Sequence, residues 1–317
     1  MSDGTRGETQ GSVAAPRTAG DMLRMAREFL QRKGIEEARL EAELLVAHAL
    51  GFDRLRLFLA LDRPVTAEEI DRARDLLVRR GRREPTAYIV GRREFYKREF
   101  QVGKGVLVPR PETEHLVDRA RELSGERGTG AASAWDDPAA PWIADLGTGS
   151  GCIALTCALE LPAACVTAVD VSGAAVLCAR ANLAALDAAG ALAGRVELLE
   201  GDGFDVLARR VRERGRKLDL LLSNPPYVAR EEAATLAPEV KDYEPELALS
   251  APAGDPDHGA RRLLDAAREL VVPGGAVLVE LGLGQAPRVA ELARARGFTP
   301  AFVRDLAKIE RVLEVRV

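Results

Sequence analysis

The sequence predicts an α/β protein in which a small helical domain precedes a doubly wound, mostly parallel sheet with an antiparallel hairpin at one edge. Three observations lead to this prediction. From Trp142 onward, apolar runs of strand length alternate with amphipathic runs of helical length, as in parallel sheets covered on both faces. The last two predicted strands have no helix between them. The residues before Pro85 show helical periodicity and no strand pattern.

Length and charge exclude several classes of protein. A chain of 317 residues suggests two domains, and 47% hydrophobic with 30% charged residues is typical of a globular protein. With 45 Lys and Arg against 49 Asp and Glu, the net charge is −4, so the whole molecule is no general binder of polyanions. All uncharged apolar runs are shorter than the roughly 20 residues of a membrane-spanning helix.

The cysteines and the N-terminus predict a cytoplasmic protein without a bound metal. Residues 1–17 lack the apolar core of a signal peptide, and we expect them to form a disordered tail. The cysteines have neither a zinc-binding nor a redox spacing and lie in Ala-rich apolar segments, where a free thiol behaves as a small hydrophobic group. They are Cys152, Cys157, Cys165 and Cys178.

Residues 18–84 are predicted to form the helical domain. Capping residues and glycines mark four short helices, with Thr18, Asp53 and Thr66 at starts and Gly34, Gly51 and Gly81 at ends. Such a small bundle is only marginally stable by itself. We therefore expect it to pack against another part of the protein or to bind a partner.

Residues 85–111 are predicted to be a hairpin linker, and residues 112–317 the main domain. The strands expected in the linker are Glu94–Tyr96, Phe100–Val102 and Val106–Val108. The main domain begins with a helix over 112–123. Residues 124–141 are rich in Gly, Ala, Ser and Pro, and we expect them to form a mobile loop.

Strands and helices then alternate in the main domain. The expected strands are Trp142–Leu146, Cys165–Asp170, Arg195–Glu200, Leu218–Leu222, Ala276–Leu281, 298–303 and 310–316. The first expected helix follows the first of these strands and ends near Leu159. The others cover about 173–188, 204–214, 257–271 and 285–296. A long loop separates the fourth strand from the 257–271 helix.

A glycine-rich turn joins the first of these strands to its helix. Glycine lets the backbone approach a ligand closely, and amide groups at a helix start favour an anionic group. The spacing is Gly-x-Gly-x-Gly, which differs from the Gly-x-Gly-x-x-Gly of a dinucleotide fingerprint. The candidate cofactor-binding residues here are Gly147, Thr148, Gly149, Ser150 and Gly151.

Carboxylates follow the next two strands. Asp170 ends the second strand, where a carboxylate accepts hydrogen bonds from ribose hydroxyls; its alternative role is to cap the helix at Ser172. Asp202 ends the third strand and, with Gly203, suits an adenine amino group, or it serves a simple turn. Nicotinamide enzymes and S-adenosylmethionine enzymes share these features, so the features do not decide between them.

The segment Asn224-Pro225-Pro226-Tyr227 follows the fourth strand and indicates the chemistry. An amide or arylamine nitrogen is a weak nucleophile because its lone pair is delocalised. The Asn224 side-chain carbonyl and the Pro225 backbone carbonyl can accept its two N–H groups, and these bonds strengthen as positive charge develops on nitrogen during methyl attack. The prolines stiffen the turn, and Tyr227 offers an apolar face to the planar group. Possible acceptors are adenine in DNA, guanine in RNA and a glutamine side chain.

The sequence resembles the peptide-chain release factor glutamine methyltransferases (the PrmC/HemK family) from about residue 20 to 317. Apart from the glycine turn and Ser223–Tyr227, the matching segments are Pro85–Gly91, Glu94–Tyr96, Val108–Glu114, Glu280–Gly282 with Gln285, and Arg304–Leu306. The resemblance implies a class I S-adenosylmethionine-dependent methyltransferase fold. It also implies methylation of the glutamine side chain in the Gly-Gly-Gln motif of class 1 release factors, in support of translation termination.

By position, the resemblance implies that Gly147–Gly151, Asp170, Gly203 and Asn224 contact S-adenosylmethionine. Asn224–Tyr227 would hold the glutamine amide, and the helical domain would bind the release factor. We expect a cytoplasmic monomer with no membrane partner and no stable nucleic-acid partner. Gly203 stands where the family often has an aromatic residue, for which Phe204 would compensate.

Two further features leave alternatives open. Arg110 could face the cofactor carboxylate, and Glu112 and Glu114 could cap a helix or pair with Arg110. Segment 79–98 holds eight basic residues and is either solvated or a docking surface for nucleic acid or a ribonucleoprotein. The main alternative function is therefore a nucleic-acid adenine or guanine amino-methyltransferase, and a third is a binding module without turnover.

Overall fold

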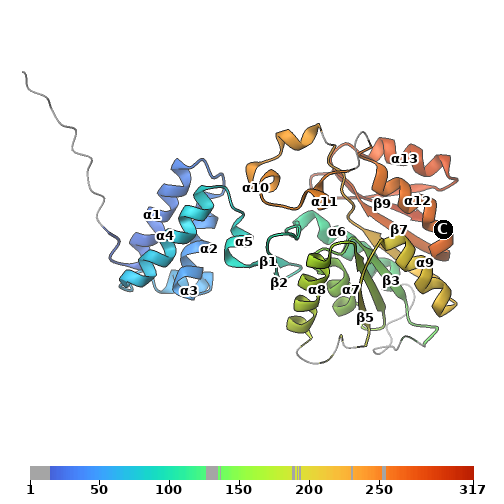
Figure 1. Cartoon of the computed structure of the whole chain (residues 1–317), viewed down its shortest axis with the longest axis horizontal. Helices are drawn as coiled ribbons and strands as arrows, with labels where there is room; N and C mark the ends of the chain where they lie inside the picture. The colour runs from blue at the N-terminus through green and yellow to red at the C-terminus, as the bar shows by residue number, and fades with distance from the viewer. Residues whose placement is uncertain are drawn as a thin grey trace, which may run out of the picture. The chain divides into compact units, whose positions relative to one another are not determined.

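The computed structural model describes residues 15–125, 135, 137–187, 190, 192, 194–229, 231–251 and 255–317. Most of the expected tail (1–17) and of the expected mobile loop (124–141) lies outside these residues. The chain divides into two compact units, Met1–Val90 and Gly91–Val317. Both are drawn in Figure 1, and each is described by itself below.

Unit Met1–Val90 is a helical bundle. Its helices are α1 (Ala19–Arg32), α2 (Ala38–Leu50), α3 (Arg54–Leu59), α4 (Ala67–Gly81) and α5 (Thr86–Val90). The cap predicted at Thr18 accepts the Asp21 N–H at 3.1 Å, and the Thr66–Glu69 capping box has both of its hydrogen bonds. The sequence did not predict α5, because five residues are too few for helical periodicity to show.

Unit Gly91–Val317 begins with a two-stranded antiparallel sheet of β1 (Arg92–Phe95) and β2 (Arg98–Gln101). The strand predicted at Val106–Val108 is absent from the structure: the Val108 N–H donates to the Glu244 carboxylate at 3.0 Å rather than to a neighbouring strand. The 3-10 turn η1 (Pro111–Thr113) and helix α6 (Glu114–Gly125) follow.

Among the described residues, seven strands form one sheet in the order β5-β4-β3-β6-β7-β9-β8. Neighbours from β5 to β7 are parallel, whereas β9 is antiparallel to both β7 and β8. This confirms the predicted fold class and its edge hairpin. The strands are β3 (Trp142–Leu146), β4 (Cys165–Asp170), β5 (Val196–Glu200), β6 (Leu218–Ser223), β7 (Val271–Glu280), β8 (Pro300–Arg304) and β9 (Glu310–Arg316).

Helices cover both faces of this sheet (Figure 1). One buried cluster joins the sheet to α6, α7 (Cys152–Glu160) and α8 (Gly173–Leu186), and includes Leu116, Ile153 and Val176. The other joins it to α9 (Gly203–Arg214), α12 (His258–Leu270) and α13 (Ala286–Ala295), and includes Leu207, Leu263 and Val289. Because both faces are covered, the carboxyl ends of the parallel strands are the natural place for a ligand.

Strand β7 begins five residues earlier than predicted. Gly274 has a positive φ of 80°, and a Cβ at Gly275 would lie 2.7 Å from the Asp219 carbonyl oxygen. The two glycines therefore let β7 continue past a register shift between Leu218 and Leu220, although glycine has a weak strand propensity. The predicted long loop also holds three short helices: η2 (Glu232–Thr235), α10 (Pro238–Lys241) and α11 (Glu246–Leu249).

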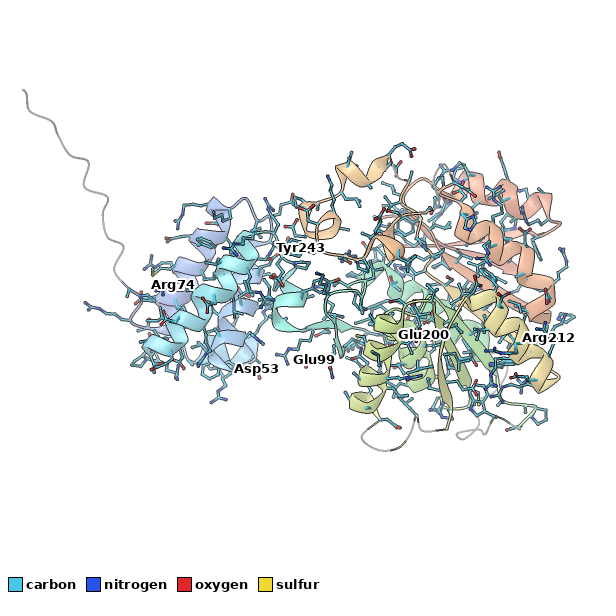
Figure 2. All side chains as sticks on the ribbon, in the orientation of Figure 1. Asp53, Arg74, Glu99, Glu200, Arg212 and Tyr243 are labelled. Atoms are coloured by element: carbon cyan, nitrogen blue, oxygen red, sulfur yellow. The ribbon has the colours of Figure 1, made fainter. Side chains whose placement is uncertain are left out.

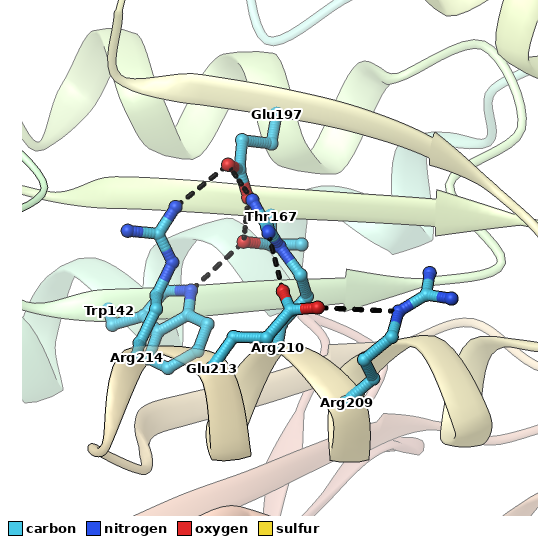
Figure 3. Close-up of polar contacts among 7 residues, drawn as sticks. All are labelled: Trp142, Thr167, Glu197, Arg209, Arg210, Glu213 and Arg214. Carbon is cyan, nitrogen blue, oxygen red and sulfur yellow. Dashed lines mark hydrogen bonds and ion pairs between the residues drawn. The ribbon is translucent and has the colours of Figure 1, made fainter.

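Helix α9 is held on the sheet by a polar cluster (Figure 3). The Glu197 carboxylate pairs with Arg210, and with Arg214 at 2.7 Å. Trp142 Nε1 donates to Thr167 Oγ1 at 3.0 Å. The cluster sets the position of α9, whose first residues follow Glu200 at the end of β5 (labelled in Figure 2) and reach the site described next.

Candidate functional site

A cavity of about 760 Å³ lies at the carboxyl ends of the parallel strands. Of the residues predicted to form the site, those that line it are Gly147, Thr148, Gly149, Ser150, Asp170, Asp202, Gly203, Asn224, Pro225 and Pro226. Gly151 and Tyr227 do not line it. A Cβ at Gly151 would lie 3.1 Å from Ala179 Cβ, so this glycine lets α7 and α8 pack closely. Among the described residues, no three His, Cys, Asp or Glu side chains gather as metal ligands.

The glycine turn presents bare backbone to the cavity. Gly147 and Gly149 have φ of 80° and 57°, and a Cβ on either would meet no atom within 4 Å. The amide groups expected to face a ligand are mostly used within the protein: Gly147 and Thr148 donate to the Val169 carbonyl, and Gly149 to Asp170. The turn therefore offers a close approach to a ligand rather than a row of free donors.

Asp170 is rigidly placed at the end of β4. Its Oδ2 accepts the Gly149 N–H at 2.8 Å, and its Oδ1 accepts the Ser172 N–H at 2.9 Å. Ser172, rather than Asp170, caps α8 by accepting the Ala175 N–H at 3.3 Å. A carboxylate oxygen accepts more than one hydrogen bond, so both oxygens keep capacity for a ligand's hydroxyl groups.

Asp202 caps α9 and also faces the cavity. Its Oδ1 accepts the Phe204 N–H at 3.0 Å and lies 3.5 Å from Arg262. The Arg262 guanidinium stacks on the Phe204 ring, 4.2 Å from its centroid. Phe204 and Arg262 both line the cavity beside Gly203. The flat Phe204 ring and Arg262 guanidinium, at the Gly203 end of the cavity, suit a planar ligand group.

Asn224 leaves the sheet directly after β6. Ser223 is fixed by its hydroxyl, which donates to the Leu146 carbonyl at 2.7 Å. The Asn224 Nδ2 then donates to Thr113 Oγ1 at 3.4 Å. Because the nitrogen end of the amide is used in this way, the oxygen end is left for a ligand in the cavity.

Two glycines shape the backbone of this segment. A Cβ at Gly259, in the first turn of α12, would lie 2.4 Å from Pro225 Cβ. A Cβ at Gly282 would lie 2.7 Å from Tyr227 Cδ2. Gly282 is held in turn by Gln285, whose Oε1 accepts its N–H at 2.6 Å. Any side chain at either glycine would displace the segment that carries Asn224.

Gly259→Ala is expected to lower kcat for the reaction of this site about 10- to 100-fold, because a shift of about 1 Å in a positioning segment has effects of this size. Alanine in a helix is otherwise as stable as glycine or more so, by up to about 1 kcal/mol. Thermal unfolding and steady-state kinetics check this together. Gly125→Ala in α6, where a Cβ meets no atom within 4 Å, is the control. A Gly259→Ala enzyme as active as this control would contradict the expectation.

Arg110 is tied to Glu244 rather than to Glu112 or Glu114. Arg110 and Glu244 form an ion pair of 2.5 Å, and the Glu244 carboxylate also accepts the Val108 N–H. Glu114 accepts the Tyr96 N–H at 2.7 Å. Of the two roles expected for Glu112 and Glu114, pairing with Arg110 is therefore wrong, because Arg110 pairs with a buried carboxylate from a distant segment; both glutamates do lie in the first turn of a helix. Arg110 still lines the cavity.

Glu280 is a buried carboxyl behind the Asn224 segment. It ends β7 and is only 3% exposed, and no described residue hydrogen-bonds to its Oε2. The pKa of Glu280 is raised to about 7, chiefly by burial and to a smaller extent by Glu112, against the opposing effects of the Thr113 hydroxyl, Arg311 and Arg110. Burial and then the charge of Glu280 also raise the pKa of Tyr227.

The raised pKa of Glu280 predicts that the free energy of unfolding changes with pH. The folded pKa of about 7 lies above the ordinary value of 4.5, so the contribution of Glu280 to stability is complete below pH 4.5 and is lost as the pH rises through 7. Relative to wild type, Glu280→Gln should therefore gain about 1–3 kcal/mol of unfolding free energy between pH 5 and pH 8. Urea unfolding of both proteins across this range measures it. The comparison isolates Glu280 from Asp145, whose pKa burial also raises to about 7. A constant difference would contradict the prediction.

Sequence reasoning missed one wall of the cavity. His258, Gly259, Arg262 and Leu263 line it from α12. Their spacing is that of one helix face, which could have been found in the predicted 257–271 helix. Leu107 lines it from an irregular segment, and Leu247 from α11, whose four residues are too few for a periodic signal.

Two family models match the chain. Residues 21–91 match the one described as PrmC N-terminal domain, and residues 133–240 the one described as methyltransferase small domain. The chain is 38% identical to a release factor glutamine methyltransferase of Geobacter sulfurreducens, covering 95% of this chain and 97% of that one. Proteins of the same name from Chlorobaculum tepidum (40% identity; 92% and 95% covered) and Cereibacter sphaeroides (41%; 94% and 98%) are similar too.

A solved structure is also similar to this chain. It is the hMettl16 catalytic domain in complex with a 3'UTR hairpin, which matches with a TM-score of 0.50 and 15% identity. The match covers 80% of this chain and 84% of that one. At this identity the likeness establishes the fold alone.

Proposed function

Because the chain belongs to the release factor glutamine methyltransferase family, we propose that it methylates the glutamine side chain in the Gly-Gly-Gln motif of class 1 release factors, in support of translation termination. The enzyme is an S-adenosylmethionine-dependent methyltransferase. The observation that carries the proposal is Asn224: its nitrogen donates to Thr113, and its oxygen is left to accept from a planar amide in the cavity.

The residues of the cavity fit S-adenosylmethionine. The bare surface of Gly147 and Gly149 admits a ligand where any Cβ would project. Asp170 is the proposed acceptor for the ribose hydroxyls, and Asp202 with Gly203 the proposed contact for the adenine. When bound, the cofactor supplies an electrophilic methyl group. The cavity of about 760 Å³ has room for a cofactor of this size and a substrate side chain.

In the proposed mechanism, the chain orients the acceptor nitrogen and stabilises developing charge. The Asn224 side-chain oxygen and the Pro225 carbonyl accept the two N–H groups of the glutamine amide. Both bonds strengthen as the nitrogen becomes positive, so they stabilise the transition state more than the ground state. Packing of Pro225 on Gly259 and of Tyr227 on Gly282 holds the two acceptors in place. No basic group is needed before methyl transfer, because the proton leaves the nitrogen after its charge has developed.

The alternative acceptor, a nucleic-acid base, draws support from the basic segment 79–98. Four of its eight basic residues, however, are paired with carboxylates. Arg79 pairs with Glu84 at 2.5 Å, and the buried Arg80 pairs with Glu41. In the second unit, Arg92 pairs with Glu99 and Arg98 with Glu160, at 3.1 and 2.6 Å. Paired guanidinium groups contribute little to a positive surface, which favours the protein acceptor.

We further propose that the enzyme works as a monomer in the cytoplasm and binds its release factor through the helical unit. All residues of the cavity come from unit Gly91–Val317, so the helical unit is available to bind the substrate protein. The cysteines are free thiols, as in a reducing compartment. No helix among the described residues is long and apolar enough to cross a membrane.

Transfer of label from radioactive S-adenosylmethionine tests the proposed function. Purified release factor, the same factor with its Gly-Gly-Gln glutamine replaced, DNA and RNA are offered in parallel. Label on the intact factor alone is the expected result. Label on DNA or RNA would transfer the assignment to the alternative. Bound cofactor without transfer to any acceptor would indicate a binding module.

A further inference from the structure

The orientation of the Asn224 amide decides whether the proposed site works. An asparagine side chain has one end that accepts hydrogen bonds and one that donates them. If the NH2 end faced the cavity, it would oppose the N–H groups of the substrate amide. A rotation of 180° about the last side-chain bond exchanges the two ends without changing shape. The protein must therefore supply a partner that selects one of the two.

Thr113 is placed to make this selection. It is 3% exposed, and its N–H donates to the Arg110 carbonyl at 3.2 Å, which fixes the η1 turn. Its Oγ1 accepts from Asn224 Nδ2 at 3.4 Å. Thr113 and Asn224 both line the cavity, so the opposite end of the amide is the one available to a ligand.

Glu280 is the carboxyl group that the Thr113 hydroxyl influences. Parallel pairing sets Ser223 beside Val279, so the next residues, Asn224 just after β6 and Glu280 at the end of β7, are neighbours. The Thr113 hydroxyl opposes the rise in the pKa of Glu280, as a hydroxyl that donates to a neighbouring carboxylate does. A hydroxyl has a single proton. A proton directed to Glu280 would leave the Thr113 oxygen to accept from Asn224, and the hydroxyl would then select the NH2 end.

We infer that Thr113, oriented by Glu280, is a positioning residue for methyl transfer that holds the Asn224 oxygen toward the acceptor nitrogen. The inference rests on the proposed function, since it concerns the same transfer step. Thr113 touches Asn224 and acts through it. Its hydroxyl, rather than its volume, is the part that matters, and this separates the inference from a simple packing role.

A series of Thr113 variants tests the inference with release factor as the acceptor. Thr113→Val keeps the shape and removes the hydroxyl, and it should lower kcat about 10- to 100-fold with the KM for S-adenosylmethionine changed less than about twofold. Thr113→Ser restores the hydroxyl and should recover kcat to within about threefold of wild type. Equal kcat for Thr113→Val and wild type would overturn the inference, and so would a Ser variant as slow as the Val variant.

A double-mutant cycle with Asn224→Ala tests whether Thr113 acts through Asn224. Single-turnover labelling over hours measures the slow variants. Thr113→Val should slow transfer less than about twofold when Asn224 is already Ala. The same loss in both backgrounds would overturn the inference and make Thr113 a structural residue. Wild-type enzyme that labels no release factor would instead overturn the proposed function, and the inference with it.

Discussion

Asn224→Ala is expected to lower kcat for methyl transfer about 100- to 1000-fold, the size of effect seen when one preorganised hydrogen-bonding group is removed from a transition state. The substrate amide loses the acceptor that strengthens as its nitrogen becomes positive. The Kd for S-adenosylmethionine should change less than about threefold, because Asn224 contributes one contact among many around the cavity. Steady-state labelling gives kcat, and calorimetry gives Kd.

Asn224→Asp is the matched comparison for this variant. It retains the side-chain shape and an acceptor oxygen, but it removes the NH2 that donates to Thr113. Its kcat should lie between those of Asn224→Ala and wild type. If Asn224→Ala turned over at the wild-type rate, the proposed mechanism would be wrong whatever the acceptor.

Asp170→Ala should weaken binding of S-adenosylmethionine by about 1–3 kcal/mol, which is about 5- to 150-fold in Kd. Two effects both weaken cofactor binding. The proposed hydrogen bonds to the ribose are lost, and the N–H groups of Gly149 and Ser172 lose the carboxylate that fixes the glycine turn. Calorimetry with the cofactor alone measures the change without any acceptor.

Two controls make this result decisive. Asp71→Ala applies the same chemical change to an aspartate whose side chain is 65% exposed in α4, and it should leave Kd unchanged. Asp170→Asn keeps the side-chain shape and one of the two oxygens that accept from Gly149 and Ser172, so it reports on the carboxylate even if Asp170→Ala unfolds. An unchanged Kd in folded Asp170→Asn and Asp170→Ala would exclude Asp170 from the cofactor site.

The sequence predicted the sheet well because buried parallel strands leave strong signals. Trp142–Leu146 and Cys165–Asp170 have the predicted bounds, since each is a mostly apolar run with an aspartate at or next to its carboxyl end. The same reasoning places the carboxyl ends of these strands together. It therefore places Gly147, Asp170 and Asn224 around one cavity. Local sequence and strand order were sufficient for these residues.

Contacts between distant segments could not be predicted in this way. The Val106–Val108 segment has the composition of a strand, yet it pairs with Glu244, a residue over 130 positions away. Thr113 bonds to Asn224 across a similar separation. The raised pKa of Glu280 results from burial, which depends on every element packed around it. The folded structure alone reveals such relations.

Tandem mass spectrometry of the release factor after reaction with S-adenosylmethionine tests the central claim most directly. The expected result is a single methyl group on the side-chain nitrogen of the glutamine in the Gly-Gly-Gln peptide, absent when Asn224→Ala replaces the wild-type enzyme over the same time. A methyl group on another residue, or an unmodified peptide under conditions in which the enzyme binds the cofactor, would contradict the account.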